Sequence, residues 1–341
     1  MKTFNLCLLG FGNVGRALVR LLTEKSAEMR DAYGIEWRIT GVATRRMGWN
    51  VCPEGFAFES TSAWEAHEVT SQSTSSPANV RAWLAAARCD VLFETTSLEA
   101  LTGQPAIEHA RAALEAGAHV VTANKGTIVH AYRELAALAR ARGRRFLFEA
   151  TVADMPVFSL FRECLPTAHV RGFRGIFNST TNVILEELER GGTFADGVRR
   201  AQSLGIAETD PSADVDGWDS AVKACALANV LMDVPLRLAE IAREGIRALA
   251  AERVRAARAA GRPYKLVSRA ARTADGSIEA RVRPEQIAAD DPLSAASGTS
   301  LIIHFELDVL PGLTLTAHDP DLRSTAYGLL SDFINAVRDE V

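Results

Sequence analysis

The first half of the chain alternates short apolar runs with longer segments whose apolar residues recur at the helical period. Residues 4–9 form such a run, and from Arg16 to Arg30 apolar residues repeat every three or four positions. This alternation predicts strands and helices in turn, and therefore a doubly wound, parallel α/β sheet. The expected strands are residues 4–9, 37–43, 91–93, 119–121 and 146–148, and the expected helices are residues 16–30, 80–87, 105–116 and 132–142.

After residue 150 this rhythm changes, and the pattern predicts an α+β domain with a mixed sheet. Pro156 is expected to open a helix, because proline is favoured in the first helical turn. Asp275 and Gly276 form the expected turn between two strands. The expected strands are residues 169–177, 265–272, 277–283, 301–310 and 313–317, and the expected helices are residues 156–164, 183–189, 194–204, 238–260 and 322–337, with a further helix that begins at Asp216.

The two patterns divide the chain into two domains. Residues 1–150 are expected to bind a dinucleotide, and residues 151–317 to bind substrate and form the interface of a homodimer. Residues 318–341 contain a helix with an apolar stripe, which is expected to return and complete the first domain. Residues 50–79, with a Ser/Thr-rich tract, are expected to form an irregular surface excursion without chemistry. The stripe consists of Leu322, Ala326, Leu329, Leu330, Phe333 and Val337.

A glycine-rich turn stands between the first expected strand and the helix after it. It reads Gly10-Phe11-Gly12-Asn13-Val14-Gly15. Gly10 allows the tight turn, Gly12 lets a pyrophosphate approach the backbone, and Gly15 lets the helix pack closely on the strand. The helix N-terminus then faces the phosphates. In this position the motif predicts a Rossmann-type dinucleotide site; the alternative is a glycine turn with no ligand.

Polar residues at three further strand ends indicate how the nucleotide is held. Arg45 and Arg46 follow the second strand, where an NAD enzyme has an acidic residue that binds the ribose. Two arginines suit a 2′-phosphate, so NADP(H) is favoured and NAD(H) is the second choice; the alternative is that both side chains are merely solvated. Thr95 and Thr96 follow the third strand and Lys125 the fourth, at the carboxyl edge where open α/β sheets bind ligands.

A loop rich in carboxylates precedes an apolar helix. It reads Gly205-Ile206-Ala207-Glu208-Thr209-Asp210-Pro211, and then Asp214-Val215-Asp216-Gly217-Trp218-Asp219. Pro211 excludes a continuous helix in the first half, and Asp216 is the expected N-cap of the helix that follows. Asp219 and Lys223 are four positions apart and share one helix face. The pair suits proton transfer on a small polar substrate; the alternative is a solvated surface pair worth about 0.3–0.5 kcal/mol.

Composition narrows the classes of function. Of the 341 residues, 48% are hydrophobic and 23% charged, and the net charge of −4 gives no reason to expect nucleic acid or an anionic membrane as partner. No apolar run approaches the ~20 residues of a membrane span, and no signal peptide is expected. Five scattered cysteines without a C-x-x-C motif fit buried thiols in a reducing compartment. A cytoplasmic protein is expected.

With these segments in place, the chain resembles the homoserine dehydrogenase family from Phe4 to about Gly245, and more weakly to its end. Three motifs behind the glycine turn carry the resemblance. They are Thr122-Ala123-Asn124-Lys125-Gly126, Gly175-Ile176-Phe177-Asn178-Ser179-Thr180-Thr181-Asn182, and the acidic loop of residues 205–219 with Lys223. The family interconverts L-aspartate 4-semialdehyde and L-homoserine with a nicotinamide cofactor, in threonine and methionine biosynthesis. The resemblance therefore implies an NAD(P)-dependent dehydrogenase that acts on a CH–OH group.

The resemblance also implies catalytic roles. Lys223 is the expected acid/base group, with Asp219 as its partner on the substrate, and Lys125 is expected near the reacting oxygen or the substrate. An ammonium group can protonate the alkoxide that develops as hydride arrives. Which of the two lysines carries the proton stays open.

Substrate contacts are implied for three more residues. Glu208 is expected to hold the amino group of the amino-acid substrate, and Asp214 is among the nearby acids that can bind an ammonium. Thr180 is expected to lie against the substrate or the nicotinamide. For the Ser and Thr residues of this motif, helix capping alone is the alternative.

The chain departs from the family pattern at several places. Ser179 and Ile206 replace a usual glycine and a usual aromatic residue. Ala153-Asp154-Met155 replaces a glycine-rich run near the family's monovalent cation site, which puts a cation held by Glu149 and Val152 in doubt. The largest departure is Ala317-His318-Asp319-Pro320-Asp321, where the family has a Gly-Ala-Gly loop that approaches the cofactor. Substrate identity and cofactor preference are therefore open, and feedback control through a C-terminal regulatory domain is not expected.

Three alternatives stand beside a homoserine dehydrogenase. The first is a dehydrogenase of the same mechanism that acts on another hydroxy or oxo amino acid, as the altered segment 317–321 suggests. The second is a non-catalytic nucleotide-binding sensor on the same scaffold, although the acid/base residues are all present. The third is a structural or interaction protein, for which the composition shows no patch or repeat.

Overall fold

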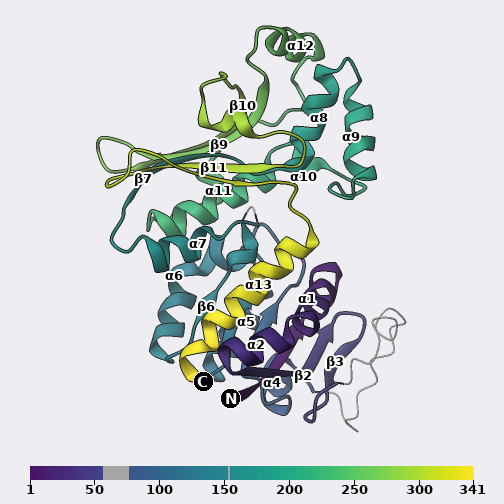
Figure 1. Cartoon of the computed structure of the whole chain (residues 1–341), viewed down its shortest axis with the longest axis vertical. Helices are drawn as coiled ribbons and strands as arrows, with labels where there is room; N and C mark the ends of the chain where they lie inside the picture. Colours follow the sequence, from purple (N-terminus) through teal and green to yellow (C-terminus); the bar gives the residue numbers. More distant parts are fainter. Residues whose placement is uncertain (57–76, 153) are drawn as a thin grey trace. The chain divides into compact units, whose positions relative to one another are not determined.

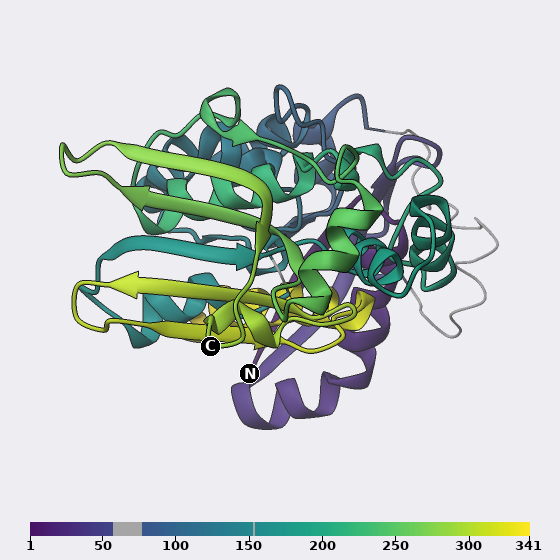
Figure 2. The same cartoon turned by 90° about the horizontal axis from the view of Figure 1, so that it is seen from above.

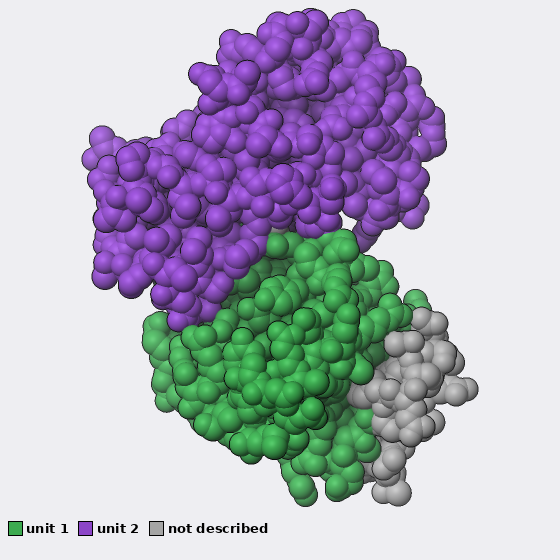
Figure 3. All heavy atoms as spheres, viewed as in Figure 1, with its two compact units in different colours: residues 1–154, 321–341 green, residues 155–320 purple. Residues whose placement is uncertain are grey.

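The computed structural model describes residues 1–56, 77–152 and 154–341. It consists of two compact units, which Figure 3 colours separately. Unit 1 contains residues 1–154 and 321–341, and unit 2 contains residues 155–320. Most of the excursion expected at residues 50–79 lies outside the described residues.

Unit 1 is built on a six-stranded sheet in the order β3-β2-β1-β4-β5-β6. β1 pairs in parallel with β2 and β4, and the parallel pairing continues through β5 to β6. The strands are β1 (Lys2–Leu9), β2 (Ile35–Thr44), β3 (Gly48–Val51), β4 (Val91–Glu94), β5 (His119–Thr122) and β6 (Phe146–Leu147). The predicted doubly wound fold is confirmed. One edge differs, because residues 48–51, expected to be irregular in part, form a strand antiparallel to β2.

The helices of unit 1 follow the predicted order. They are α1 (Asn13–Glu24), α2 (Ser26–Tyr33), α4 (Val80–Ala86), α5 (Ala106–Glu115), α6 (Gly126–Ala141) and α13 (Leu322–Val337). The single helix expected over residues 16–30 is two helices that meet at Lys25. α6 begins six residues earlier than expected and is kinked at Ala131, whose backbone angles are not helical. Among the described residues no helix has the length and apolarity needed to cross a membrane.

The C-terminal helix α13 belongs to the core of unit 1, as its apolar stripe predicted. Phe333 makes edge-to-face contacts with Phe4 of β1 and Phe93 of β4, at centroid distances of 6.2 and 5.9 Å. α13 lies alongside α1 in Figure 1. The first stripe position was predicted wrongly, because Leu322 is half exposed at the start of the helix. The other stripe residues are buried.

An ionic cluster around Glu340 holds the residues after α13 against the rest of unit 1. Its carboxylate contacts the Lys2 ammonium at 2.8 Å, the His119 ring at 2.8 Å and the Arg144 guanidinium at 2.6 Å. Burial alone would raise the pKa of Glu340, but hydrogen bonds from Lys2 and His119 outweigh it and lower the pKa to about 2. The charged carboxylate is therefore favoured in the folded state. Its stabilisation is complete above the ordinary value of 4.5 and is lost as the pH falls toward 2.

We expect Glu340→Gln to lower the melting temperature at pH 7 by about 2–4 °C, which corresponds to roughly 1 kcal/mol for a partly exposed ionic cluster. The difference from the wild type should shrink as the pH falls from 4.5 toward 2, where the native carboxylate becomes protonated. Asp339→Asn is the matched control, because Asp339 pairs with the half-exposed Arg145 at 3.3 Å and both side chains lie at the surface. Equal melting temperatures for Glu340→Gln and the wild type at pH 7 would contradict the prediction.

Unit 2 is built on a mixed sheet in the order β12-β11-β7-β9-β10-β8, whose long strands lie side by side in Figure 2. β8 is parallel to β10, and the other neighbours are antiparallel. The strands are β7 (Val170–Ile176), β8 (Ala242–Arg243), β9 (Tyr264–Arg272), β10 (Ile278–Gln286), β11 (Leu301–Leu307) and β12 (Leu313–Ala317). The predicted mixed sheet is confirmed.

The helices of unit 2 are α7 (Val157–Ser159), continued by a π-helical turn over Leu160–Cys164, then α8 (Ser179–Glu189), α9 (Phe194–Ser203), α10 (Ser212–Val215), α11 (Trp218–Leu231) and α12 (Ala251–Ala259). Helices α8, α11 and α12 pack on this sheet, and α9 packs on α8. α8 begins four residues earlier than predicted. The helix expected over residues 238–260 was wrong in its first half. That stretch holds a short 3₁₀ turn (Leu238–Glu240) and strand β8 instead.

Candidate active site

The glycine turn of unit 1 has the geometry that its sequence predicted. Gly10 has a φ of +92°, and a Cβ there would lie 2.5 Å from the backbone of Thr95, so this position requires glycine. The Thr95 hydroxyl donates to the Gly10 carbonyl at 2.7 Å and fixes the turn to the end of β4. A Cβ built on Gly12, the N-cap of α1, meets no atom within 4 Å. Open space beside the helix N-terminus fits a pyrophosphate.

The carboxyl ends of β4 and β5 carry the other predicted nucleotide contacts. Thr96 follows β4, and its hydroxyl and backbone N–H donate to the fully buried Glu94. Asn124 follows β5, and its side-chain amide donates to the Thr96 carbonyl at 3.1 Å. Lys125 comes next, at the start of α6, with a half-buried side chain. The two strand ends therefore form one hydrogen-bonded edge. Sequence reasoning missed Glu94 and Asn124 as the groups that hold it together.

Arg45 and Arg46 lie in the turn between β2 and β3, and both side chains are exposed. The turn follows the carboxyl end of β2, which is the position where a Rossmann fold contacts the adenosine ribose. Two exposed cations there could meet a 2′-phosphate without first breaking a buried contact.

In unit 2, Lys223 lies on α11 against the end of β7. Its ammonium group is 2.8 Å from the Asp219 carboxylate and donates to the Phe177 carbonyl at 2.6 Å. The side chains of Lys223 and Asp219 are only 14% and 20% exposed, so this i,i+4 pair is not a solvated surface pair. The helix N-cap was predicted wrongly: Gly217, in a left-handed conformation, takes the place expected for Asp216.

Asn178 connects this pair to a second carboxylate. It is the N-cap of α8, and its side-chain oxygen accepts the Thr181 N–H at 2.9 Å. Its amide nitrogen donates to Asp214 at 2.6 Å and to Asp219 at 3.1 Å. One side chain thus both begins the helix and orients two acids. Sequence reasoning assigned Asn178 no contact with these acids, because nothing in the local sequence indicates partners 36 and 41 positions away.

Asp214 lies in an environment that disfavours its charge. Burial raises the pKa of its carboxyl, and the nearby Asp219 charge raises it further; the hydrogen bond from Asn178 and the charge of Lys223 act in the opposite direction. Asp214 therefore becomes charged only at a higher pH than an ordinary aspartate. A group of this kind can gain its charge when a cationic substrate group arrives.

Thr180 and Glu208 sit differently. Thr180, in the first turn of α8, is buried, and its hydroxyl donates to the Ile206 carbonyl at 3.0 Å. It therefore joins α8 to the acidic loop. The side chain of Glu208 in that loop is exposed, and its backbone carbonyl accepts a hydrogen bond from Gln202 at 3.1 Å. The structure thus gathers Lys223, Asp219, Asp214 and Thr180 through direct contacts, and leaves the Glu208 carboxylate in solvent.

Two family models match the chain in succession. The model described as "Homoserine dehydrogenase, NAD binding domain" matches residues 10–149, and the model described as "Homoserine dehydrogenase" matches residues 156–334. The chain belongs to the homoserine dehydrogenase family. The expected class, a nicotinamide-dependent dehydrogenase, is thereby confirmed.

Individual relatives in the homoserine dehydrogenase family span nearly the whole chain. A protein of Pseudomonas canavaninivorans named NAD(+)-dependent homoserine dehydrogenase is 35% identical over 98% of this chain and 96% of its own. A homoserine dehydrogenase of Methanocaldococcus jannaschii is 30% identical over 97% and 98%. A solved structure of a mutant hyperthermophilic archaeal homoserine dehydrogenase in complex with NADPH superposes with a TM-score of 0.83, at 28% identity over 99% and 98%.

Glu149 and Val152 are the residues at which the sequence left a monovalent cation in doubt. Both side chains are buried, and the Glu149 N–H donates to the Asp332 carboxylate of α13 at 2.6 Å. Within residues 1–56, 77–152 and 154–341, no group of three or more His, Cys, Asp or Glu side chains is arranged to hold a metal ion.

Proposed function

We propose that the protein interconverts L-homoserine and L-aspartate 4-semialdehyde with a nicotinamide cofactor. The observation that carries this proposal is the buried Lys223–Asp219 pair, held against the Phe177 carbonyl in a chain of this family. A bound nicotinamide supplies the hydride that reduces the aldehyde carbon, or accepts it in the reverse direction. The open space at Gly12 fits the pyrophosphate of such a cofactor.

Lys223 is the proposed acid/base group. In the direction of reduction its ammonium donates a proton to the oxygen of the aldehyde as that oxygen gains negative charge. In the direction of oxidation the neutral amine removes the hydroxyl proton as hydride leaves the carbon. Asp219 holds the ammonium at 2.8 Å and is positioned by Asn178. Lys125, in unit 1, is the proposed second cation near the substrate.

Acids of the loop before α11 are proposed to bind the amino group of the substrate. Asp214 is partly buried beside Asn178, and the exposed Glu208 carboxylate could turn toward a bound ammonium without breaking a buried contact. Thr180 is proposed to lie against the substrate or the nicotinamide. Its hydroxyl donates to the Ile206 carbonyl and so joins the acidic loop to the start of α8.

Spectrophotometric assays of homoserine oxidation with NADP, and then with NAD, test the proposed function. Turnover of L-homoserine above that of other hydroxy amino acids supports it. Turnover of another hydroxy amino acid in preference to homoserine would replace the substrate and keep the mechanism. The altered segment 317–321 motivates that second candidate. Absence of nucleotide-dependent turnover with every amino-acid alcohol would overturn both and favour the non-catalytic sensor.

NADP(H) is the proposed cofactor, on the basis of Arg45 and Arg46. The relatives include both a protein named NAD(+)-dependent and a complex with NADPH. We expect Arg45→Ala to raise the KM for NADP about fivefold to tenfold, as for the loss of a charge-assisted contact of about 1 kcal/mol, and to leave the KM for NAD within twofold. Arg30→Ala, at an exposed arginine of α2, is the control. Equal changes for both nucleotides would show that Arg45 does not read the 2′-phosphate.

The protein is proposed to form a homodimer and to lie in the cytoplasm. The mixed sheet of unit 2 supports the homodimer, because its edge strand β12 is only partly buried and the β11–β12 turn exposes Val309 and Leu310. The five cysteines are all free thiols, which supports the cytoplasmic location. Light scattering during size-exclusion chromatography would test the dimer.

A further inference from the structure

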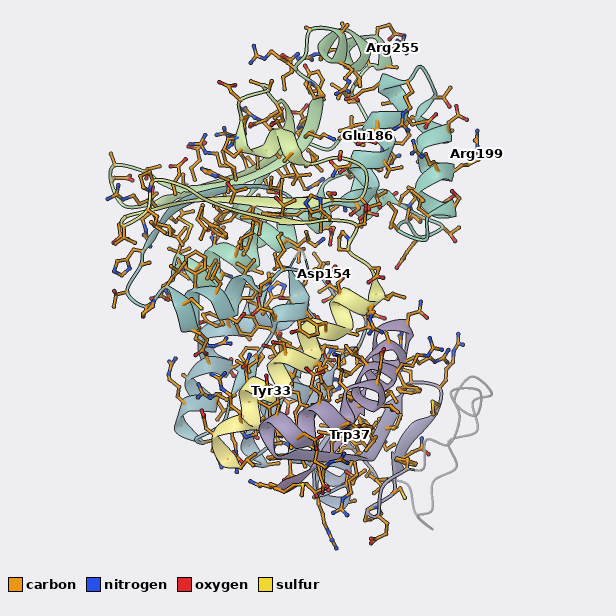
Figure 4. All side chains as sticks on the ribbon, viewed as in Figure 1. Tyr33, Trp37, Asp154, Glu186, Arg199 and Arg255 are labelled. Atoms are coloured by element: carbon orange, nitrogen blue, oxygen red, sulfur yellow. The ribbon has the colours of Figure 1, made fainter. Side chains whose placement is uncertain are left out.

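One face of α8 holds three consecutive residues of the segment that precedes β11. The Ser179 hydroxyl donates to the Thr299 carbonyl at 2.7 Å, and the Asn182 amide donates to the Ser300 carbonyl at 3.2 Å. The Glu186 carboxylate accepts the Gly298 N–H at 2.6 Å. Positions 179, 182 and 186 share a face of the helix. Residues 298–300 are therefore fixed along α8, on which Figure 4 labels Glu186.

At Glu186, this contact includes a largely buried ion pair. The Lys265 ammonium of β9 is 3.7 Å from the Glu186 carboxylate, and the two side chains are only 7% and 14% exposed. Burial lowers the pKa of Lys265, while the neighbouring carboxylates of Glu186 and Glu189 act against this change. A buried acceptor that binds a backbone N–H beside a cation is costly to disturb. The contact between α8 and residues 298–300 is therefore a fixed part of unit 2.

Thr299 extends this contact to the segment that departs from the family pattern. Its side-chain hydroxyl donates to the Asp319 carboxylate at 2.6 Å. β11 and β12 pair antiparallel with Leu301 opposite Ala317, so two residues further on Thr299 stands opposite Asp319. The hydrogen bond between the Thr299 and Asp319 side chains thus continues the β11–β12 pairing beyond its last residue pair. Asp319 has a φ of +46°, a left-handed conformation that aspartate tolerates better than most residues.

We propose that Thr299 is a positioning residue for the substrate site, which couples residues 317–320 to the N-terminus of α8. Its carbonyl is bound by Ser179, which is flanked by Asn178 and Thr180, and its hydroxyl is bound to Asp319. Asn178 in turn orients Asp214 and Asp219. The Asp319 carboxylate in residues 317–320 therefore binds Thr299, and α8 holds Thr299 through the hydroxyl of Ser179. The expected effect on substrate binding rests on the proposed function.

Thr299→Val and Thr299→Ser test the proposal, because valine keeps the shape and removes the donor, whereas serine keeps the donor. We expect Thr299→Val to raise the KM for homoserine threefold to tenfold, to change kcat less than twofold, and to leave the dissociation constant for the nucleotide unchanged. Thr299→Ser should restore the wild-type KM. Asp319→Ala should reproduce the valine variant, and the double variant should be no worse than either single one. This second site keeps the test valid if Thr299→Val folds poorly.

Amide hydrogen exchange separates this inference from the proposed function. Residues 317–320 and 179–182 should exchange faster in Thr299→Val than in Thr299→Ser, whichever amino acid is the substrate. An inactive wild type with this exchange difference would overturn the proposed function and leave the coupling in place. Exchange and KM values for Thr299→Val equal to those of the wild type would overturn the inference. Equal melting temperatures of the two threonine variants would exclude a general loss of stability as the cause.

Discussion

Lys223→Ala is expected to lower kcat about a thousandfold, while the nucleotide binds with unchanged affinity. A positioned acid/base side chain contributes roughly 10²–10⁴ in rate. Lys223 is the buried cation against which Asp219 and the Phe177 carbonyl are arranged. The nucleotide fingerprint lies in unit 1 and does not depend on this side chain. Steady-state kinetics together with a fluorescence titration of reduced nucleotide would measure both quantities.

The matched control for this variant is Lys25→Ala. Lys25 pairs with Glu28 at the same distance of 2.8 Å, but its side chain is 40% exposed. Its loss should leave turnover unchanged, because the pair is an ordinary surface pair. Lys223→Met keeps the apolar stem of the lysine and guards against misfolding of the alanine variant. Turnover of Lys223→Met within tenfold of the wild type would reject the acid/base role.

Asp219→Asn is expected to lower kcat/KM by about 10–100-fold. The amide keeps the shape of the side chain but removes the charge that faces the Lys223 ammonium, and hydrogen bonds to charged groups are worth about 1.5–3 kcal/mol. It also replaces the acceptor that Asn178 now meets at 3.1 Å. Kinetics with varied homoserine at saturating nucleotide would measure the effect.

Asp216→Asn provides the comparison for Asp219→Asn. Asp216 belongs to the same loop, but its carboxylate binds Arg247 at 2.8 Å, and the two side chains are 36% and 54% exposed. We expect kcat/KM within twofold of the wild type. If Asp216→Asn and Asp219→Asn lost activity equally, the loss would reflect the fold of the loop and not the charge beside Lys223.

Local pattern was sufficient for the parts of this site that depend on neighbours in sequence. The i,i+4 spacing placed Asp219 beside Lys223, and the glycine turn appeared between the expected strand and helix. The return of α13 to unit 1 was also visible, because its apolar stripe had to be covered. These features arise from periodicity and backbone conformation, which a sequence displays directly.

The parts that could not be predicted depend on distant contacts. Aspartate is a favoured N-cap residue, so Asp216 was expected to begin the helix. Its carboxylate instead binds Arg247, 31 positions later, and Gly217 is the N-cap. Residues 242–246 lie within an Ala- and Arg-rich stretch that favours helix. They are not helical, because Ile246 donates to the Val215 carbonyl, and because Gly245 packs so closely that a Cβ would lie 2.3 Å from the same oxygen. Periodicity carries no information about such partners.

The place of α13 in the sequence sets an order of events during synthesis. Residues 326–337 fill the core of unit 1 against Phe4 and Phe93, yet they follow all of unit 2 in the chain. The nucleotide-binding half of the protein is begun before unit 2 on the ribosome, but it cannot close its interior until residues 326–337 have also been made. Unit 2 is contiguous and can fold earlier. A nascent chain stalled before residue 322 would therefore present an open apolar groove where α13 belongs, and would be a natural target for chaperones.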